Sequence, residues 1–578
     1  MNDTGYIRQA EIILRQIQAV PAYAQLRARH PDPEMIEPEA LAMILEAAAR
    51  FSEEVLYPVN RHGDVQGCRL EQGQVITPDG YKQAWQQLVE QGWNAIDQPV
   101  EYGGQGLPSF VNVACRELFD RACMAMGMVS GPQRAAALVL MEFASPETCK
   151  EWIGKFVEGR WSASIGISEP DAGSDVGRVR TRATPQPDGS WRIDGEKMWT
   201  SFGGNDMVER IGCLLLARTP DAPAGTAGLS LFLVPDKVLD SDGKWKGNGV
   251  VVQRIEEKLG LHGSPTCVMG FEGARAELIG SINRGLPQLF VMIQNMRTLV
   301  AIEGVGIGFG ASQVAHAYAL ERRQGGDPRK PPVPIAAHAE IQRLLLTMQS
   351  RVEVLRALVL ELALRQDLMP YETDEDERTQ SFELTQWLLP ILKATCSEAA
   401  FEVSNDAVQV LGGAGYTREW PVEQWLRDSR MMSIAEGATG IQALDLLHRR
   451  LWRGERSGLR AFQGIARAEI EKADPAVAAA ALAVLNQLDA AADELDRWRA
   501  SPRDAEAGAT AFLQLATLAA TGWMAVRLAS LAGEDEHTRR LVALGRYWLS
   551  DLELRAAHQA AQVGLGAERL ALFDALSM

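Results

Sequence analysis

The sequence predicts a multidomain α+β protein in which a central antiparallel β domain separates helical regions. Three observations carry this prediction. Apolar residues recur at helical spacing up to about residue 158, short apolar segments bounded by Gly, Pro and Asp follow, and the helical period returns after Leu286. With 578 residues the chain is longer than one hydrophobic core usually serves, so several packed units are expected.

We expect five regions along the chain, divided where the hydrophobic pattern changes. They are an N-terminal helical extension (1–40), an N-terminal helical domain (41–158), a β domain (159–285), a four-helix bundle (286–455) and an extra C-terminal helical domain (460–578). A Gly-containing linker at Gly454–Gly458 precedes the last region.

The N-terminal regions show the helical period first at Ile12, Ile13, Ile17 and Val20. A Gly-rich loop, Glu101–Pro108, interrupts this pattern. Glycine permits unusual backbone geometry there, and no Lys and Ser/Thr follow at the spacing of a phosphate-binding loop. We therefore interpret the loop as a structural turn.

The β domain is predicted from short apolar segments that leave no room for helices between most of them. These segments are Trp161–Ile167, Trp191–Ile193, Gly212–Ala217, Leu229–Val234 and Val250–Val252.

The bundle is predicted from a long amphipathic pattern, and its members are Ile341, Leu344, Leu345, Met348, Val352, Leu355, Val359 and Leu362. The glycines of the run Gly304–Gly310 lie in a helical pattern and favour close helix packing over phosphate binding. In the last region, Val484, Leu488 and Leu495 belong to another amphipathic helix.

Composition excludes several classes of function. The formal net charge is −17, and the region from Arg460 onward holds 12 Lys/Arg against 16 Asp/Glu, which argues against a nucleic-acid partner. No apolar run approaches about 20 uninterrupted residues, so no membrane span is expected. The N-terminus lacks a basic-then-apolar signal, and the seven dispersed cysteines form no C-x-x-C pair, which predicts a cytoplasmic protein with reduced thiols. The eight histidines show no metal-binding spacing, so no metal is expected.

Three sequence blocks stand out as chemistry-bearing. The first, Ile165–Asp175 (IGISEPDAGSD), leaves a strand and enters a polar turn. The second, Gly195–Gly204, places Trp199 beside hydroxyl residues, which suits either a core position or a planar heterocycle packed on the indole. The third runs from Gln409 (QVLGGAGYTREWP) to Ile434–Gln442 (IAEGATGIQ).

In this order and in these domains, the three blocks resemble the acyl-CoA dehydrogenases, and the likeness covers residues 40–455. The chain also looks like the long bacterial branch that includes 3-methylthiopropionyl-CoA dehydrogenase. This likeness lies in Asn60–Tyr81, which contains Leu70–Pro78, in Gly260–Met269 and in the extra C-terminal domain. The resemblance implies FAD as cofactor and removal of the α-proton of a thioester substrate.

The resemblance assigns the catalytic base to Glu436. Proton transfer needs a carboxylate within hydrogen-bond reach of the α-carbon. The sequence alone leaves an alternative open, because Ser433-Ile-Ala-Glu436 also matches a helix capping box. In some branched-chain relatives the base precedes a retained arginine; here Met296 precedes Arg297 and cannot accept a proton.

The other site residues are implied one position at a time. Ile167 and Ser168 are expected at the pyrimidine edge of the flavin, Trp199 against the ring and Ser201 near N5. Arg322 should meet the FAD pyrophosphate, where a guanidinium makes bidentate bonds, and Arg322, Gln409 and Gly413 should reach a neighbouring subunit's FAD, which implies at least a homodimer. Substrate-side contacts are expected from Ser174, Arg297 and Gly437.

The chain departs from the family pattern at three places. Ala438 stands where threonine is usual, Ile165 where an aromatic residue is common, and Gly325 where phenylalanine is common. The first departure removes or shifts one hydrogen bond to FAD or to the subunit interface. The other two change the packing expected on the adenine side.

Three functional hypotheses follow. The first is an FAD-dependent acyl-CoA dehydrogenase that passes electrons to an electron-transferring flavoprotein. The second is a flavin acyl-CoA oxidase that reduces dioxygen, and the third is a non-enzymatic binding protein on the same fold. The acidic C-terminal domain counts against nucleic acid in the third hypothesis.

Overall fold

The computed structural model describes residues 5–576, and the chain divides into two compact units. The first unit combines the chain up to Ala49 with residues 113–121 and everything from Val300 onward. The second contains residues 50–112 and 122–299. Two long helices, α6 (Ser109–Phe143) and α8 (Gly285–Glu321), have segments in both units.

The N-terminal extension is helical, as predicted. It forms α1 (Tyr6–Ala19) and α2 (Pro21–Arg29), and α3 (Pro38–Phe51) follows. Prolines begin α2 and α3, where the missing N–H has no helical partner to lose. Residues 12, 13 and 17 of α1 are fully buried, so the periodicity located the packed face of this helix.

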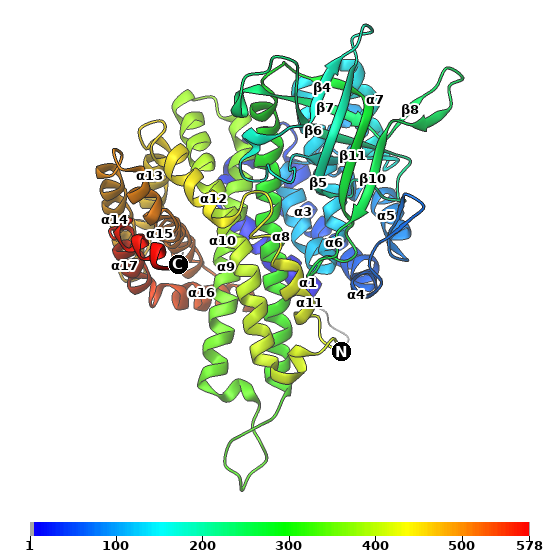
Figure 1. Cartoon of the computed structure of the whole chain (residues 1–578). Coiled ribbons are helices and arrows are strands. Elements are labelled where there is room, and N and C mark those ends of the chain that lie inside the picture. The colour runs from blue at the N-terminus through cyan, green and yellow to red at the C-terminus, as the bar shows by residue number, and fades with distance from the viewer. Residues whose placement is uncertain (1–4, 577–578) are drawn as a thin grey trace. The chain divides into compact units, whose positions relative to one another are not determined.

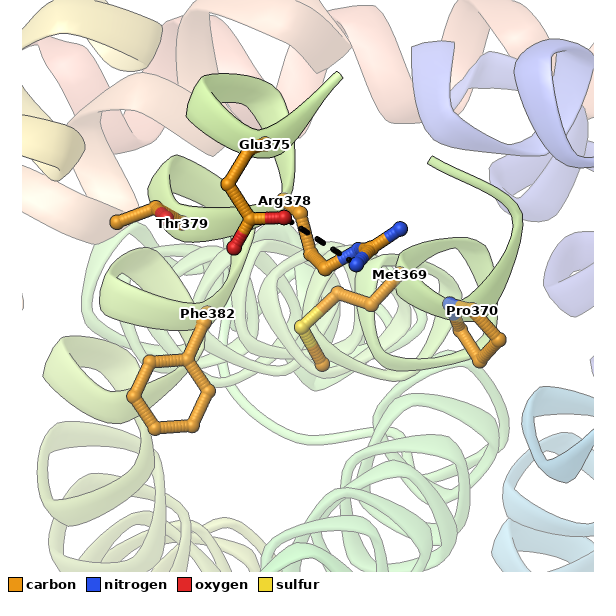
Figure 2. A pocket seen from close by; sticks show the side chains of 6 residues that line it. All are labelled: Met369, Pro370, Glu375, Arg378, Thr379 and Phe382. Atoms are coloured by element: carbon orange, nitrogen blue, oxygen red, sulfur yellow. Dashed lines mark hydrogen bonds and ion pairs between the residues drawn. The ribbon is translucent and has the colours of Figure 1, made fainter. Parts of the chain in front are cut away.

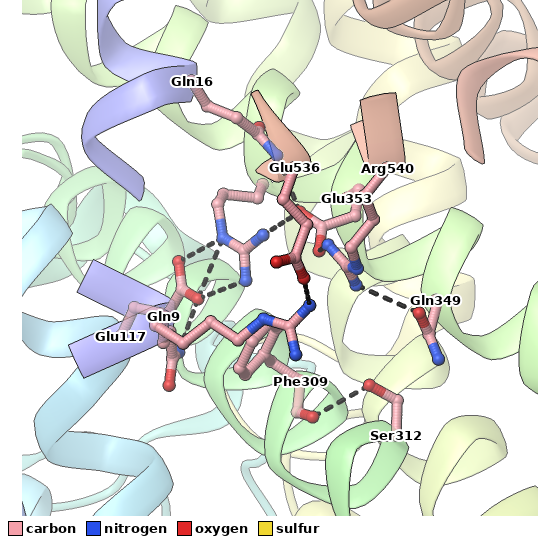
Figure 3. Close-up of polar contacts among 11 residues, drawn as sticks. Gln9, Gln16, Glu117, Phe309, Ser312, Gln349, Glu353, Glu536 and Arg540 are labelled. Atoms are coloured by element: carbon pink, nitrogen blue, oxygen red, sulfur yellow. Dashed lines mark hydrogen bonds and ion pairs between the residues drawn. The ribbon is translucent and has the colours of Figure 1, made fainter. Parts of the chain in front are cut away.

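A network of buried charges joins α1 to other helices of the first unit (Figure 3). The guanidinium of Arg356 donates to both carboxylate oxygens of Glu117 at 2.7–2.9 Å and also pairs with Glu353. The Gln9 amide donates to Glu117 at 2.7 Å, and Arg540 donates to Glu353 at 2.6 Å. Helices α1, α6, α9 and α16 thus share one polar cluster inside the unit.

The helices of the second unit begin with a π-helical stretch, Ser52–Leu56, followed by α4 (Tyr57–Gln66), α5 (Tyr81–Glu90) and α7 (Pro146–Val157). In the Gly-rich loop, Gly103 has φ +90°, and a Cβ on Gly104 would lie 2.1 Å from the carbonyl oxygen of Gln98. The glycines permit this tight turn, which confirms the structural interpretation.

The β domain contains a seven-stranded sheet ordered β10-β11-β5-β4-β6-β3, with β7 paired to both β11 and β6. Its strands are β3 (Trp161–Gly166), β4 (Arg182–Pro185), β5 (Trp191–Ser201), β6 (Arg210–Arg218), β7 (Leu229–Pro235), β10 (Val250–Ile255) and β11 (Thr266–Ile279). Most pairs are antiparallel, but β3 runs parallel to β6 over six residue pairs and β4 meets β6 in parallel at one. The antiparallel prediction is wrong for these pairs, because two strands and long turns intervene between β3 and β6 and no hairpin can join them.

Strand β6 forms the centre of this domain, since all but its last residue are buried. Leu214 and Leu216 face a cluster that includes Trp152 of α7. Cys213 and Leu215 face the opposite cluster, which the inward residues of β5, β7 and β11 complete. A hairpin of β8 (Lys237–Leu239) and β9 (Trp245–Gly247) extends away from the sheet (Figure 1).

The predicted four-helix bundle contains three long helices, namely α8, α9 (Ala339–Leu368) and α10 (Glu375–Leu411). Two short helices follow, α11 (Val422–Ser429) and α12 (Thr439–Leu444), and α12 continues as a π-helical stretch, Asp445–Leu451. A Cβ on Gly304 would lie 2.4 Å from the Cys396 carbonyl oxygen. The glycine run therefore allows close helix packing, as predicted.

The last region forms five helices: α13 (Ser457–Ile470), α14 (Pro475–Arg497), α15 (Pro502–Ala529), α16 (Glu536–Leu549) and α17 (Leu552–Val563). A 3₁₀ segment, Glu568–Leu576, follows. Phe512 and Trp523 of α15 are fully buried, and Phe512 meets Trp387 of α10 edge to face. The extra domain thus packs on the bundle within the first unit (Figure 1).

Within residues 5–576, three helices are long and apolar enough to cross a membrane by length and composition, namely α8, α14 and α15. The most apolar windows of α8 and α15 are 89% and 83% buried inside the protein, whereas that of α14 is 39% buried. Helices that are apolar all round also occur in the cores of large proteins. The expected lack of a membrane span stays a prediction.

Candidate active site

The β-domain part of the candidate site lies where β3 ends beside β5. Ile167 and Ser168 follow β3 directly and are half-buried, and the Ser168 carbonyl accepts a 2.9 Å hydrogen bond from the Met198 amide. Trp199 on β5 is 57% exposed and has φ +60°, an uncommon conformation for a bulky residue. Its indole is therefore not a core side chain, and it stands free beside the half-buried Ser201 to pack against a flat ring.

A buried ion pair fixes this part of the site from inside. Lys197, fully buried on β5, donates to the Glu169 carboxylate at 2.7 Å and to the Ile167 carbonyl at 3.1 Å. Glu169 also accepts from the Thr181 hydroxyl at 2.6 Å and from two backbone amides, those of Arg180 and Thr181. The pair ties the segment after β3 to the strand that carries Trp199.

The pKa values of the pair follow from burial and charge. Burial acts to raise the pKa of Glu169, but Lys197 and the hydrogen bonds from Thr181 and Arg180 outweigh it and hold that pKa below its ordinary value. Burial lowers the pKa of Lys197, although Glu169 acts in the opposite sense. Neither residue was predicted from the sequence, although a lysine next to the apolar Met198-Trp199 pair was an available signal.

The two predicted substrate residues of this unit differ in exposure. Ser174 lies exposed in the turn that follows Glu169, whereas Arg297 on α8 is only 5% exposed. The Arg297 guanidinium lies 5.9 Å from the ring centroid of Phe290. Ser174 is thus accessible to a ligand, and the role of Arg297 remains an expectation from the family.

Glu436 lies in a non-helical segment between α11 and α12. Its φ is +53° and that of Gly437 is +90°, and Ala438, which precedes α12, makes no side-chain cap bond. Ser433 hydrogen bonds with Arg430 instead of capping a helix. The capping-box interpretation is therefore wrong, because Glu436 does not occupy a helical position.

Side chains of the bundle hold this segment from two directions. Lys393 of α10 donates to the carbonyls of Met432 and Gly437 at 2.8 and 2.7 Å. The amide of Gln442 on α12 donates to the carbonyls of Glu436 and Gly437 at 3.0 and 3.1 Å. The segment therefore has a defined conformation although it belongs to no regular element.

A buried acidic cluster, which was not predicted from the sequence, occurs in the same unit. Arg116 on α6 lies 2.7 Å from Asp120 and 3.2 Å from Glu303 of α8, and all three are at most 5% exposed. Burial raises the pKa of both acids; for Glu303, Asp120 and then Glu436 add to the increase, while Arg116 opposes it. The sequence signal for this cluster was a single acidic residue, Glu303, inside the apolar run Leu299–Val305.

The remaining cofactor candidates lie on exposed positions of the first unit. Arg322 follows the end of α8, and its guanidinium donates to Gln324 at 3.3 Å. Gln409 lies in the last turn of α10, and Gly413 follows the helix end. All three are exposed, so they are accessible to a group outside this chain.

Ala438 stands where the family usually has a threonine, which is the first departure from the family pattern. The Thr439 hydroxyl next to it donates to Glu398 of α10, so the neighbouring threonine anchors the segment to the bundle.

Among the described residues, no group of three or more His, Cys, Asp or Glu side chains is arranged to hold a metal ion.

A surface pocket lies elsewhere in the bundle, between the end of α9 and the start of α10 (Figure 2). Its lining residues are Met369, Pro370, Glu375, Arg378, Thr379 and Phe382. None of the predicted site residues is among them, and within this lining Arg378 donates to Glu375 at 3.3 Å. We assign no role in the reaction to this pocket.

The chain matches the sequence profiles of the three acyl-CoA dehydrogenase domains: the N-terminal domain over residues 38–160, the middle domain over 164–274 and the C-terminal domain over 283–451. It is 37% identical to a 3-methylmercaptopropionyl-CoA dehydrogenase of Ruegeria pomeroyi, over 90% of this chain and 88% of that protein.

Solved structures with the same fold include the following two. The crystal structure of Caenorhabditis elegans ACDH-11 in complex with C11-CoA has a TM-score of 0.78 at 21% identity, covering 92% of this chain and 90% of that one. An acyl-CoA dehydrogenase from Bacillus anthracis complexed with FAD has a TM-score of 0.74 at 20% identity, covering 90% and 87%.

The chain therefore belongs to the acyl-CoA dehydrogenase family, a class of oxidoreductases that bind FAD. Its resemblance to that family, inferred from the three sequence blocks, is confirmed. So is the predicted order of helical, β and helical domains.

Proposed function

We propose that the chain oxidises a saturated acyl-CoA thioester to the trans-2-enoyl-CoA, with Glu436 as the base that removes the α-proton. The observation that carries this proposal is the conformation of Glu436. Glu436 lies outside any helix, in a segment whose backbone carbonyls accept four hydrogen bonds, so its backbone is held in place and it is not a helix cap.

The residues of the β domain fit a flavin. The exposed Trp199 indole offers a face for the ring system, and the backbone groups of Ile167 and Ser168 with the Ser201 hydroxyl offer donors and acceptors for its polar edge. When bound, FAD supplies a hydride acceptor at N5 for the β-hydrogen. The Lys197–Glu169 pair would contribute orientation, because Lys197 also holds the carbonyl of Ile167.

Proton removal by Glu436 also requires a hydrogen-bond donor that stabilises the negative charge left on the substrate. As the α-proton moves to the carboxylate, negative charge develops on the thioester oxygen. In this proposal the backbone N–H of Glu436 is one donor to that oxygen, and fixed donors of this kind contribute about 3–4 kcal/mol each. The adjacent Gly437, with φ +90°, allows the backbone to turn directly after the base.

The proposal extends to assembly, acceptor and location. Arg322, Gln409 and Gly413 are exposed and would contact the FAD of a second subunit, which makes the working enzyme at least a homodimer. The electron acceptor is an electron-transferring flavoprotein, and the location is the cytoplasm. The 37% identical relative, named for a short thioether acyl group, supports a short-chain substrate. Ser174, Arg297 and Gly437 would be the substrate-side contacts.

The experiment is an anaerobic titration of the purified yellow protein with a panel of acyl-CoA esters that differ in chain length and include 3-methylthiopropionyl-CoA. Bleaching of the flavin with formation of the enoyl-CoA supports the proposal, and a lack of bleaching with every ester contradicts it. Admitting air to the reduced protein then distinguishes a dehydrogenase from an oxidase, because only an oxidase consumes dioxygen at the rate of turnover.

A further inference from the structure

Lys393 is a fully buried lysine in the middle of α10. Its ammonium group donates one hydrogen bond to the carbonyl of Met432 at 2.8 Å and another to the carbonyl of Gly437 at 2.7 Å. These two carbonyls lie four residues before Glu436 and one residue after it. One cation therefore bridges the segment that carries the proposed base.

This segment depends on such contacts because it lacks a regular backbone pattern. Glu436 has φ +53°, a conformation that residues with a Cβ rarely adopt. Hydrogen bonds from a charged donor are shorter and stronger than neutral ones, and the two at Lys393 fall in that short range. Gln442 supports the carbonyls of Glu436 and Gly437 from α12, and Glu398 of α10 accepts from Thr439.

We propose that Lys393 is a positioning residue of the dehydrogenation, which holds the Glu436 carboxylate in reach of the substrate α-carbon by clamping the backbone on both sides of it. This inference rests on the proposed role of Glu436. Lys393 itself exchanges no proton with the substrate. Its contribution is geometric, because proton transfer requires hydrogen-bond distance and a displacement of about 1 Å can cost about 10²-fold in rate.

A purely structural lysine would give a different result, so the test separates binding from proton removal. The probe is methylthioacetyl-CoA, in which sulfur replaces the β-carbon, so that the α-proton can exchange with D₂O but no β-hydride can leave. Exchange is followed by mass spectrometry, and binding by the change in the flavin spectrum. A second assay measures anaerobic bleaching by butyryl-CoA with hydrogen or deuterium at the α-carbon.

The variants are Lys393→Met, which removes the donors, and Lys393→Arg, which keeps a cation with several donors. Thr385→Val is the matched control, since Thr385 is also buried on α10 and its hydroxyl donates only to the Phe382 carbonyl of the same helix. Glu436→Gln in the same exchange assay tests the proposed base separately.

For Lys393→Met we expect FAD content and probe affinity within about twofold of wild type, with exchange and bleaching slowed about 10²-fold. The α-deuterium isotope effect should rise, because proton removal becomes the slow step. Lys393→Arg should recover most of the rate, and Thr385→Val should match wild type.

Unchanged exchange in Lys393→Met, or a loss of probe affinity that accounts for the whole loss of rate, would overturn the inference. If that variant does not fold, Lys393→Gln replaces it with the same expected result. Failure of both to fold while Thr385→Val folds would mean that Lys393 serves folding and not positioning. Exchange that survives in Glu436→Gln would instead refute the proposed base.

Discussion

Lys197 and Glu169 form an ion pair inside the β domain, with 2.7 Å between Nζ and Oε1 and side-chain exposures of 0% and 7%. The same ammonium reaches the carbonyl of Ile167, a residue proposed to lie at the flavin edge. The pair thus connects the stability of the β domain to the geometry of the proposed cofactor site.

Lys197→Met should destabilise the protein by about 3–5 kcal/mol, because it leaves the Glu169 carboxylate buried without its cation. Urea unfolding of the apoprotein measures this loss, and the flavin absorbance after gel filtration should show weaker FAD retention. The double variant Lys197→Met/Glu169→Gln removes both charges and should recover part of the stability. If Lys197→Met alone is as stable as wild type, the pair contributes nothing to the free energy of unfolding.

The pair also predicts a dependence of stability on pH. The pKa of Glu169 is held below its ordinary value of 4.5 in the folded protein, despite the opposing effect of burial. The unfolded chain therefore binds the proton more readily, and the contribution of Glu169 to stability is present above about pH 4.5 and is lost as pH falls below it. Glu169→Gln should flatten the acid part of the stability curve measured by urea unfolding, and an unchanged slope there would contradict this assignment.

The acidic cluster at Glu303 predicts the opposite trend. Burial, then Asp120 and then Glu436 raise the pKa of Glu303 above 4.5, so the folded protein retains a proton that the unfolded chain releases. Stability should therefore decline as pH rises above about 4.5, and Glu303→Gln should reduce that decline. Urea unfolding at pH 5 and pH 8 measures the difference. Glu321→Gln, at the exposed end of the same helix, is the control and should leave the decline unchanged.

The network around Arg356 predicts that the N-terminal helix is held by buried charge (Figure 3). Gln16 of α1 donates to Glu353 at 2.7 Å, and Arg356 is fully buried between Glu353 and Glu117. Arg356→Met should cost about 3–5 kcal/mol of unfolding free energy, since it leaves two buried carboxylates with fewer partners. Limited proteolysis should then cut near α1 earlier than in wild type. Equal rates of cleavage would show that α1 is held by its apolar face alone.

Much of the fold could be predicted from periodicity. The apolar spacing located α1, α9 and α14, and the short segments between Gly and Pro located five strands, because burial of one face leaves a repeating pattern in the chain. The pairing of β3 with β6 could not be predicted, since the direction of a strand depends on where its neighbours lie and not on its own pattern.

The candidate site, like the fold, could be predicted from the sequence only in part. Glu436, Trp199 and Ser168 belong to blocks with a recognisable order of residues, and the structure shows Trp199 exposed and Glu436 outside a helix. Lys197 lies in the second block, beside Met198 and Trp199, but its ion pair with Glu169 was not predicted. Lys393 could not be found from the sequence, because it acts through backbone carbonyls whose positions depend on the tertiary fold. Every residue has a backbone carbonyl, so the residue type does not indicate which carbonyl accepts a hydrogen bond.

In the proposed reaction, the Glu436 carboxylate removes the substrate α-proton. The direct measurement is the anaerobic bleaching rate of FAD-loaded Glu436→Gln, in stopped flow, with the acyl-CoA that reduces the wild type fastest. We predict a rate about 10²–10⁴-fold lower than wild type with FAD still bound, because glutamine keeps the shape of the side chain but cannot accept the proton. Bleaching at the wild-type rate would show that Glu436 is not the base.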